Sequence, residues 1–285
     1  MKPLSESELI LNEDGSIYHL QLRPGELAPI IFTVGDPQRV AKVSQYFDEV
    51  LIARQNREFT IHTGTLRGQR VSVLSTGMGT DNIDIVWNEI DALFNVDFET
   101  RTVRDDLQSV TWVRLGTSGS IQEDIEVGSL VYTKFSLGLE GLMAFYDCEG
   151  DKDQGLWQIA LEPFLPSNKA SLFACNADLE EKVKKDFDKG YTATFGGFYA
   201  PQGRSIRAKS KYPLIMDQLA ECEVNGVRIT NMEMETAGIY GLAKALGHKA
   251  ISLNAIIANR ATGLFSAEAD AIIDNMIKKA LDAIV

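Results

Sequence analysis

Short apolar runs with strand character alternate along the whole chain with segments whose apolar residues recur at helical spacing. The strand-like runs occupy residues 29–33, 59–66, 70–75, 110–115, 129–135 and 250–257. The helical segments occupy residues 37–47, 82–94, 235–246 and 266–284. No Pro-, Gly- or Ser-rich linker and no repeat interrupts this order, so the sequence predicts a single α/β domain over residues 1–285.

The formal charge of −12 excludes functions that depend on a basic surface. Nucleic acids and anionic membranes attract proteins through clustered Lys and Arg side chains. The cysteines, Cys148, Cys175 and Cys222, are widely spaced and predict neither a disulfide framework nor a zinc site. The N-terminal residues are polar and acidic, and no apolar stretch is long enough to cross a bilayer. We therefore expect a cytoplasmic protein that binds neither nucleic acid nor membrane.

The first candidate binding segment is Val-Gly-Asp-Pro-Gln-Arg-Val at residues 34–40, between a predicted strand and a predicted helix. Asp36 suits the N-cap of that helix and Pro37 its first position. Gly35 would leave backbone N–H groups accessible at the helix start, and Arg39 adds a guanidinium group, a combination that suits a phosphate. A plain turn followed by a surface arginine is the alternative, and this segment alone favours it.

A second segment, Arg-Leu-Gly-Thr-Ser-Gly at residues 114–119, is predicted as a strand end that passes into a flexible loop. Open α/β sheets bind ligands at the carboxyl ends of their strands. Arg114 and Thr117 would then offer a guanidinium and a hydroxyl group to a phosphate or a ribose. The alternative is an ordinary turn in which Arg114 forms a structural ion pair.

Aromatic, amide and guanidinium groups come together in Phe-Tyr-Ala-Pro-Gln-Gly-Arg at residues 198–204. The Gln202 amide is both donor and acceptor, Arg204 has fixed donors, and Phe198 offers a stacking face. These groups match a flat base that carries carbonyl and imide groups. A polar turn with one core aromatic residue is the alternative.

Two carboxylates flank a methionine in Asn-Met-Glu-Met-Glu-Thr at residues 231–236, just before a predicted helix. A carboxylate can accept two neighbouring sugar hydroxyls, and a thioether can lie against a sugar ring. Glu233, Met234 and Glu235 are therefore candidate sugar contacts. Acidic residues also favour helix N-termini, so helix capping is the alternative.

Taken together and in this order, six motifs resemble the uridine phosphorylase branch of the nucleoside phosphorylase family. They are Gly-Asp-Pro-x-Arg, Arg-Glu-Phe, a Gly-rich loop after Ser-Thr-Gly, Arg-x-Gly-Thr-x-Gly, Phe-Tyr-x-x-Gln-x-Arg and Asn-x-Glu-Met-Glu. The resemblance runs from about His19 to Ala261 and is weakest between Glu140 and Lys189. It implies a nucleoside phosphorylase fold, in which helices flank a central mixed β-sheet that is partly barrel-like.

The resemblance also implies a reaction, the phosphorolysis of uridine to uracil and ribose 1-phosphate, with inorganic phosphate as co-substrate and no cofactor. The residues that it implies for phosphate binding are Gly35, Arg39, Arg57, Arg114 and Thr117. Arg57 looks like an arginine lent by a neighbouring subunit, and His19 like a histidine lent to the ribose. The active unit would then be a homo-oligomer that shares its sites.

For the nucleoside, the resemblance implies base contacts from Phe198, Gln202 and Arg204 and sugar contacts from Met234, Glu235 and, with less support, Glu233. Arg204, Gln202 and Arg114 would be the catalytic residues. Hydrogen bonds from Gln202 and Arg204 would stabilise the departing uracil anion without a strong acid.

The choice of base depends on Asn259, which follows the last apolar strand. Purine-cleaving relatives typically carry an Asp there that protonates the leaving base, and an Asn cannot act as that acid. A nucleosidase that uses water, a purine nucleoside phosphorylase and a non-catalytic nucleoside-binding protein stay open as alternatives. The arginines Arg39, Arg57 and Arg114 count against the nucleosidase because water would not require them.

The chain departs from the family in its Gly-rich loop. Residues 77–82 read Gly-Met-Gly-Thr-Asp-Asn, where many members have Gly-x-Gly-x-Pro-Ser. Some bacterial relatives bind a monovalent cation such as K⁺ between subunits near this loop and the residue that corresponds to Glu58. Because Asn82 replaces the Ser, the sequence leaves open both that ion and the choice between dimer and hexamer, and it predicts no other metal site.

Overall fold

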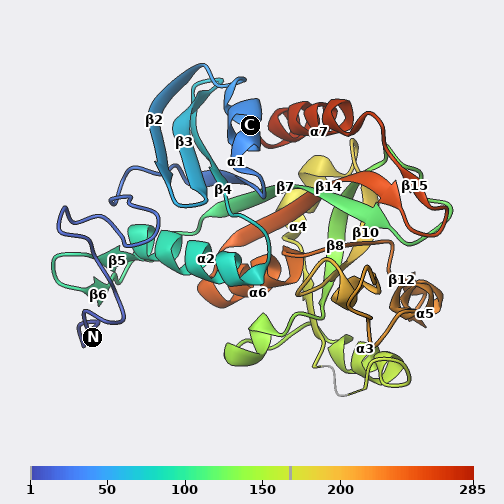
Figure 1. Cartoon of the computed structure of the whole chain (residues 1–285). Helices are drawn as coiled ribbons and strands as arrows, with labels where there is room; N and C mark the ends of the chain where they lie inside the picture. The colour runs from blue at the N-terminus through green and yellow to red at the C-terminus, as the bar shows by residue number, and fades with distance from the viewer. Residues whose placement is uncertain (1, 167–168) are drawn as a thin grey trace.

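One mixed sheet runs through the protein in the computed structural model, which describes residues 2–166 and 169–285 (Figure 1). Its strands are β1 (Ile30–Val34), β2 (Glu49–Asn56), β3 (Phe59–Leu66), β4 (Gln69–Ser75), β7 (Thr111–Ser120), β8 (Leu130–Gly138), β9 (Ser171–Ala174), β10 (Asp188–Thr194), β13 (Asn231–Glu233), β14 (Lys249–Asn259) and β15 (Leu264–Phe265). Two small ribbons pair β5 (Val96–Asp97) with β6 (Thr102–Val103) and β11 (Glu223–Val224) with β12 (Val227–Arg228).

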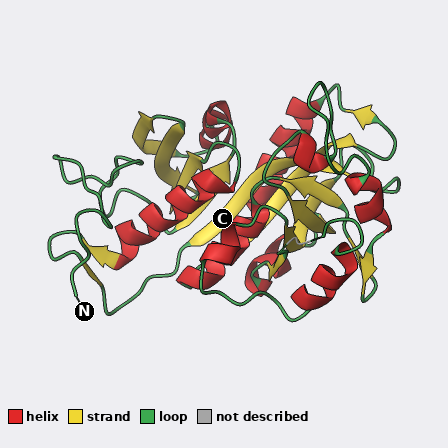
Figure 2. Ribbon diagram, turned by 60° about the horizontal axis from the view of Figure 1, so that its bottom comes forward, coloured by secondary structure: helices red, strands yellow, loops and turns green. Residues whose placement is uncertain are grey.

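Helices lie on both sides of the strands (Figure 2). They are α1 (Pro37–Ser44), α2 (Thr80–Asn95), α3 (Gln154–Leu161), α4 (Ala177–Val183), α5 (Ile215–Glu221), α6 (Thr236–Leu246), α7 (Ala269–Ile284) and the short 3-10 helices η1 (Leu142–Phe145) and η2 (Ala200–Gln202). The large core packs α1, α2, α6 and α7 against the sheet, and a smaller core packs α3 and α5 near β8 and β10. In the described part of the chain, no helix is long and apolar enough to cross a membrane.

The centre of the sheet closes on itself. β14 pairs with β7 in parallel and with β8 antiparallel. β8 pairs with β10, β10 pairs with β13, and β13 returns to β7, so five strands complete a ring. β1, β4, β3 and β2 extend the sheet outward from β7. The predicted α/β fold with a partly barrel-like mixed sheet is confirmed.

The predicted start of α1 and the β3–β4 hairpin are also confirmed. The side chain of Asp36 accepts a hydrogen bond from the backbone N–H of Gln38 (2.9 Å), and Pro37 is the first helical residue. β3 and β4 are joined at Arg67 and Gly68, both in the left-handed region that the turn requires. β2 was not predicted, because most of its side chains are exposed and show no apolar alternation.

The prediction that a strand ends at Leu115 and continues as a flexible loop is wrong. β7 continues through Gly116, Thr117 and Gly119 to Ser120. β14 pairs with it along its whole length, and the antiparallel β13 pairs with its last two residues. These partners satisfy backbone groups that would otherwise favour a turn, so the glycines stay extended. The segment that carries Arg114 is therefore a rigid barrel strand.

Candidate active site

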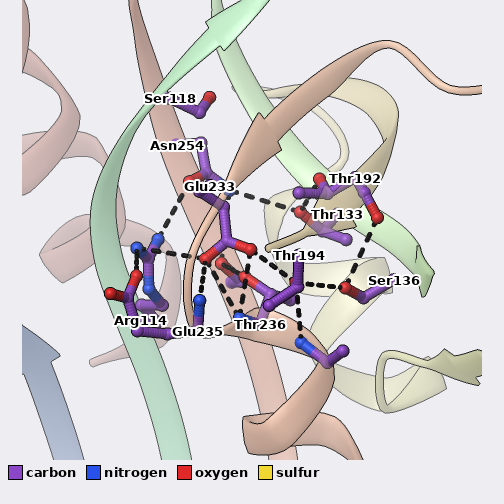
Figure 3. A network of polar contacts seen from close by, with 12 residues as sticks. Arg114, Ser118, Thr133, Ser136, Thr192, Thr194, Glu233, Glu235, Thr236 and Asn254 are labelled. Carbon is purple, nitrogen blue, oxygen red and sulfur yellow. Dashed lines mark hydrogen bonds and ion pairs between the residues drawn. The ribbon is translucent and has the colours of Figure 1, made fainter. Parts of the chain in front are cut away.

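Arg114 is the centre of a buried cluster of charged and polar groups (Figure 3). Its Nη2 donates to Oε2 of Glu235 (2.5 Å) and lies 3.2 Å from Oε2 of Glu233. Its Nη1 donates to Oδ1 of Asn254 in β14 (2.9 Å). Burial opposes the charge on Arg114, yet Glu233 and Glu235 together raise its pKa. One guanidinium thus pairs with two carboxylates at a buried site.

Glu233 is fixed by the start of α6. Its carboxylate accepts hydrogen bonds from the backbone N–H groups of Glu235 (2.9 Å) and Thr236 (3.0 Å) and from the hydroxyl of Thr194 (2.6 Å). These are the contacts of a helix cap, the alternative that its position before a helix suggested. The sugar contact predicted for Glu233 stays a prediction.

Glu235 connects Arg114 to the Gly-rich loop. Its Oε1 accepts a hydrogen bond from the backbone N–H of Gly79 (2.7 Å), and its Oε2 faces Arg114. Burial raises the pKa of Glu235, and the positive charge of Arg114 opposes that rise. Met234 lies between the two glutamates at the carboxyl end of β13 and is half-buried. The structure therefore brings three predicted nucleoside-binding residues to one strand end.

Gly116 makes room for the Arg114 side chain. A Cβ atom at Gly116 would overlap Nη1 and Cζ of Arg114, because residues two apart on a strand share one face. We expect Gly116→Ala to displace the guanidinium and to lower the free energy of unfolding by about 1–3 kcal/mol, as overpacked sites do. Denaturant unfolding and a phosphate titration of the reaction rate measure the two effects.

Gly119→Ala in the same strand is the matched control. Its nearest neighbour would be Cε of Met232 at 3.4 Å, an ordinary contact that a flexible side chain can accommodate. Equal unfolding free energies for the two alanine variants would contradict the role assigned to Gly116.

Arg39 lies close enough to Arg114 for the two positive charges to interact. Nη1 of Arg39 donates to the carbonyl oxygen of Leu115 in β7 (3.3 Å). Burial lowers the pKa of Arg39, and Arg114 lowers it further. Gly35, at the end of β1, lies against the Gly-rich loop, because its Cβ would be 3.4 Å from the carbonyl oxygen of Gly77. An anion placed between these arginines would relieve their repulsion.

Thr117, the remaining hydroxyl predicted for phosphate, lies in β7 opposite Ala255 of β14 and is half-buried. Within residues 2–166 and 169–285, no hydrogen bond connects its side chain to Arg114 or Arg39. The structure thus brings Gly35, Arg39 and Arg114 together, and phosphate binding by these residues and by Thr117 stays a prediction.

A second cluster contains the residues predicted to bind the base. Cζ of Arg204 lies 3.9 Å from the ring centroid of Phe198, and Nη1 donates to the Phe198 carbonyl oxygen (2.6 Å) and to Oε1 of Gln202. Gln202 is 3% exposed, whereas Phe198 is 50% exposed. Burial lowers the pKa of Arg204, and Arg260 lowers it further. The aromatic face, amide and guanidinium therefore come together as predicted.

Arg260 joins this cluster although the set of residues predicted to contact the base omits it. Its Nη1 lies 3.3 Å from the carbonyl oxygen of Gln202 and donates to it. It follows Asn259 at the end of β14, and this Asn-Arg pair was the available sequence signal. Asn254, which orients Arg114, gave no such signal because it lies within an apolar strand.

His19 and Arg57 lie together on the N-terminal side of the protein. Nδ1 of His19 is 2.6 Å from Oε1 of Glu89. Asn56 donates to the carbonyl oxygen of His19 (2.7 Å), and Cζ of Arg57 lies 5.5 Å from the ring centroid of Tyr18. In the described part of the chain, neither side chain forms a hydrogen bond or ion pair with Glu233, Glu235 or Asn254, the partners of Arg114. That both are lent to a neighbouring subunit stays a prediction.

Glu58 and Asn82, the two residues named for a monovalent cation, meet at the Gly-rich loop. A Cβ atom at Gly77 would overlap Nδ2 of Asn82 and lie 3.5 Å from Cγ of Glu58. The two polar side chains therefore approach the same glycine from different elements. A cation at this place stays a prediction.

Comparison with known proteins gives one family. Residues 29–284 match the family described as the phosphorylase superfamily. The chain is 31% identical to a uridine phosphorylase of Thermococcus kodakarensis over 254 residues, 89% of this chain and 81% of that protein. It is 30% identical to a DeoD-type purine nucleoside phosphorylase of Bacillus cereus over 270 residues, 94% of this chain and 98% of the other.

A solved structure has the same fold. It is a nucleoside phosphorylase of Trypanosoma brucei described as showing uridine phosphorylase activity. The TM-score is 0.89 at 30% sequence identity, with 97% of this chain and 99% of that chain covered. The relatives thus include proteins named for pyrimidine and for purine nucleosides at similar identity.

Proposed function

This chain belongs to the phosphorylase superfamily, and on that premise we propose that it transfers the ribosyl group of uridine to inorganic phosphate. The products would be uracil and ribose 1-phosphate. The observation that carries the choice of a pyrimidine is the cluster of Gln202, Arg204 and Arg260 beside the ring of Phe198. Its donors and acceptors match the carbonyl and imide groups of uracil.

The two clusters suggest how phosphate and nucleoside would react. Arg39 and Arg114 would bind phosphate and aim it at C1′ of the ribose, which converts a bimolecular reaction into a local displacement. As in other glycosidic cleavages, the sugar would gain positive charge in the transition state, and the phosphate would stabilise it. Arg204 would stabilise the negative charge that develops on uracil. The reaction as proposed needs no further cofactor.

Asn259 supports a pyrimidine because its amide already has structural partners. Nδ2 donates to the carbonyl oxygens of Gln122 (2.8 Å) and Ile125 (2.9 Å), and Oδ1 accepts from the backbone N–H groups of Ala261 (2.9 Å) and Thr262 (3.0 Å). A carboxylate could not donate to the two carbonyls. Asn259 stands where purine-cleaving relatives typically carry an Asp, and here its side chain holds two loops together, the one before β8 and the one after β14.

We expect Asn259→Asp to lower the free energy of unfolding by about 1–3 kcal/mol without creating purine phosphorolysis, because two buried carbonyl groups lose their donor. The loss should be smaller at pH 5 than at pH 8, since a protonated Asp can donate one hydrogen bond. Denaturant unfolding at both pH values and an inosine assay measure these effects. A stable variant that cleaves inosine would contradict this assignment.

We also propose that subunits share their sites, with His19 and Arg57 contributed by a neighbour. The structure supports this because both residues lie outside the Arg114 cluster. His19 contacts Glu89, and Arg57 lies next to Tyr18. Mixing an inactive Arg57→Ala protein with an inactive Arg114→Met protein tests it. Shared sites predict partial recovery of activity in mixed oligomers, whereas separate sites predict none.

The function is tested by uracil release from uridine with and without inorganic phosphate, with inosine as the parallel substrate. Phosphate-dependent release with formation of ribose 1-phosphate would support the proposal. Equal release without phosphate would identify a nucleosidase instead. The purine relatives make a purine nucleoside phosphorylase the second candidate, and faster cleavage of inosine than of uridine would establish it.

A further inference from the structure

Glu140 is a buried carboxyl group that the proposed chemistry does not use. Both of its side-chain oxygens are shielded from solvent, and within residues 2–166 and 169–285 neither makes a well-formed hydrogen bond. Burying an unpaired polar group is costly, and burying an unpaired charge is far more so. A buried carboxyl group with no hydrogen bond on either oxygen calls for an explanation.

Glu140 lies where three neighbouring strands end: β8 at Gly138, β10 at Thr194 and β13 at Glu233. A Cβ atom at Gly138 would lie 2.7 Å from Oε2 of Glu140 and 2.9 Å from Cβ of Ala237, in the first turn of α6. The carboxyl group is therefore packed between the end of β8 and the start of α6. This is the end of the barrel at which Glu233 and Glu235 hold Arg114.

The segment that leads to the predicted base-binding residues passes directly over Glu140. A Cβ atom at Gly196 would lie 3.6 Å from both Cα and Cβ of Glu140. The residue before it, Phe195, donates its backbone N–H to the carbonyl oxygen of Glu233 (2.9 Å). The backbone at Gly196 therefore packs against Cα and Cβ of Glu140.

The charges around Glu140 are unbalanced. The charged group that acts on Glu140 is Glu233 in β13, and the cation that pairs with Glu233, Arg114, also pairs with Glu235. Gly138 and Gly196, which lie against Glu140, carry no charge. Burial raises the pKa of Glu140 to about 7, and Glu233 adds to the rise, although nearby backbone N–H groups oppose it.

We propose that Glu140 positions the base-binding loop: uncharged, it holds the segment at Gly196 against the start of α6, and on ionisation it releases that segment. A carboxylate here would be buried beside the carboxylate of Glu233, so it would move toward solvent and displace Gly196. The form competent to bind uridine is then the uncharged one. This inference rests on the proposed function, because it concerns the loop that would bind the uracil base in that reaction.

The test compares uridine KM and kcat between pH 6 and pH 8.5, at saturating phosphate, for wild type and Glu140→Gln. Both proteins experience the same ionisation of phosphate and uridine, so the ratio of their KM values isolates Glu140. We expect the ratio of wild-type to variant KM to rise about tenfold from pH 6 to pH 8, as the competent fraction falls, with the kcat ratio changing less than about twofold. Glu221→Gln, at an exposed position in α5, is the control and should follow wild type.

A second measurement needs no substrate. A carboxyl group whose pKa is raised in the folded state stabilises the protein below its unfolded pKa, and that stability is lost as the pH rises through the folded pKa. The unfolding temperature of wild type should therefore fall between pH 5 and pH 8 by more than that of Glu140→Gln. Glu140→Met provides a second uncharged variant with the same expectation.

The outcomes separate the two proposals. If wild type cleaves uridine but its KM follows the same pH profile as Glu140→Gln and Glu140→Met, Glu140 does not position the loop and the inference is wrong. If wild type shows no phosphate-dependent uridine cleavage at any pH, the proposed function is wrong, and so is the claim that Glu140 controls uridine binding. The unfolding temperatures would still test the ionisation of Glu140. A kcat that changes as much as KM would show a structural rather than a positioning role.

Discussion

Arg114→Met is expected to lower the free energy of unfolding by about 3–5 kcal/mol, the usual cost of removing one partner from a buried ion pair. Met has a similar length and fills the space, so the loss arises mainly from charge. Glu233 and Glu235 would keep their buried positions but lose the guanidinium that faces both of them. The phosphate concentration for half-maximal rate should also rise steeply, because Arg114 is proposed to bind that anion.

The loss of stability in Arg114→Met should depend on pH in a definite direction. The pKa of Glu235 is already raised by burial, and without Arg114 it should rise further. A raised carboxyl pKa means stability that is present at low pH and lost as the pH rises through the folded value. Arg114→Met should therefore be closest to wild type near pH 5 and weakest at pH 8, as denaturant unfolding at the two pH values would show.

Arg54→Met is the matched control, since Arg54 forms an exposed pair with Glu26 at 2.6 Å. Such surface pairs contribute about 0–1 kcal/mol, so this variant should unfold almost as wild type does. An Arg114→Met protein as stable as Arg54→Met would contradict the buried charge cluster.

Arg204→Ala should reduce kcat by about 100–1000-fold, the range found when one donor to a developing negative charge is removed. The negative charge on uracil appears mainly in the transition state, so turnover should suffer more than binding of either substrate. The KM for phosphate should change little because Arg204 belongs to the cluster with Phe198 and Gln202. Steady-state kinetics with each substrate varied in turn measure these effects.

Arg207→Ala removes an exposed arginine from the same loop and serves as the control. It should retain nearly the wild-type kcat. Arg204→Lys tests the geometry, because a lysine keeps the charge but loses the planar guanidinium that faces Gln202 and Phe198. Unchanged turnover in Arg204→Ala, or a loss confined to the phosphate KM, would overturn the assignment.

The parts of the fold that the sequence predicted correctly depend on local chemistry. The cap of α1 follows from Asp36 and Pro37, and the β3–β4 hairpin follows from two apolar runs separated by Arg67 and Gly68. The family and the clustering of Arg39 with Arg114 followed from motifs that have a fixed order. These features need no knowledge of distant neighbours.

The parts that were missed depend on distant neighbours. β7 extends beyond Gly116 because β14, about 140 residues later in the chain, pairs with it. Asn254 and Thr194 hold Arg114 and Glu233, but each lies within a strand whose pattern indicates only burial. Two interpretations of Glu233 were possible from sequence, and its hydrogen bonds to the backbone N–H groups of Glu235 and Thr236 favour a structural role at the start of α6.

The closed ring of strands also constrains how the protein is made. β7 pairs with β14, which lies far away in the sequence, so the barrel has a high contact order. We therefore expect closure of the barrel to be the slow step of folding. β7 and β8 are synthesised before β14, so they present open edges until β14 is made, and open edges invite association between chains. The cluster at Arg114 cannot form before β13 and β14 are synthesised, so a nascent chain that lacks these strands should have no affinity for ligands.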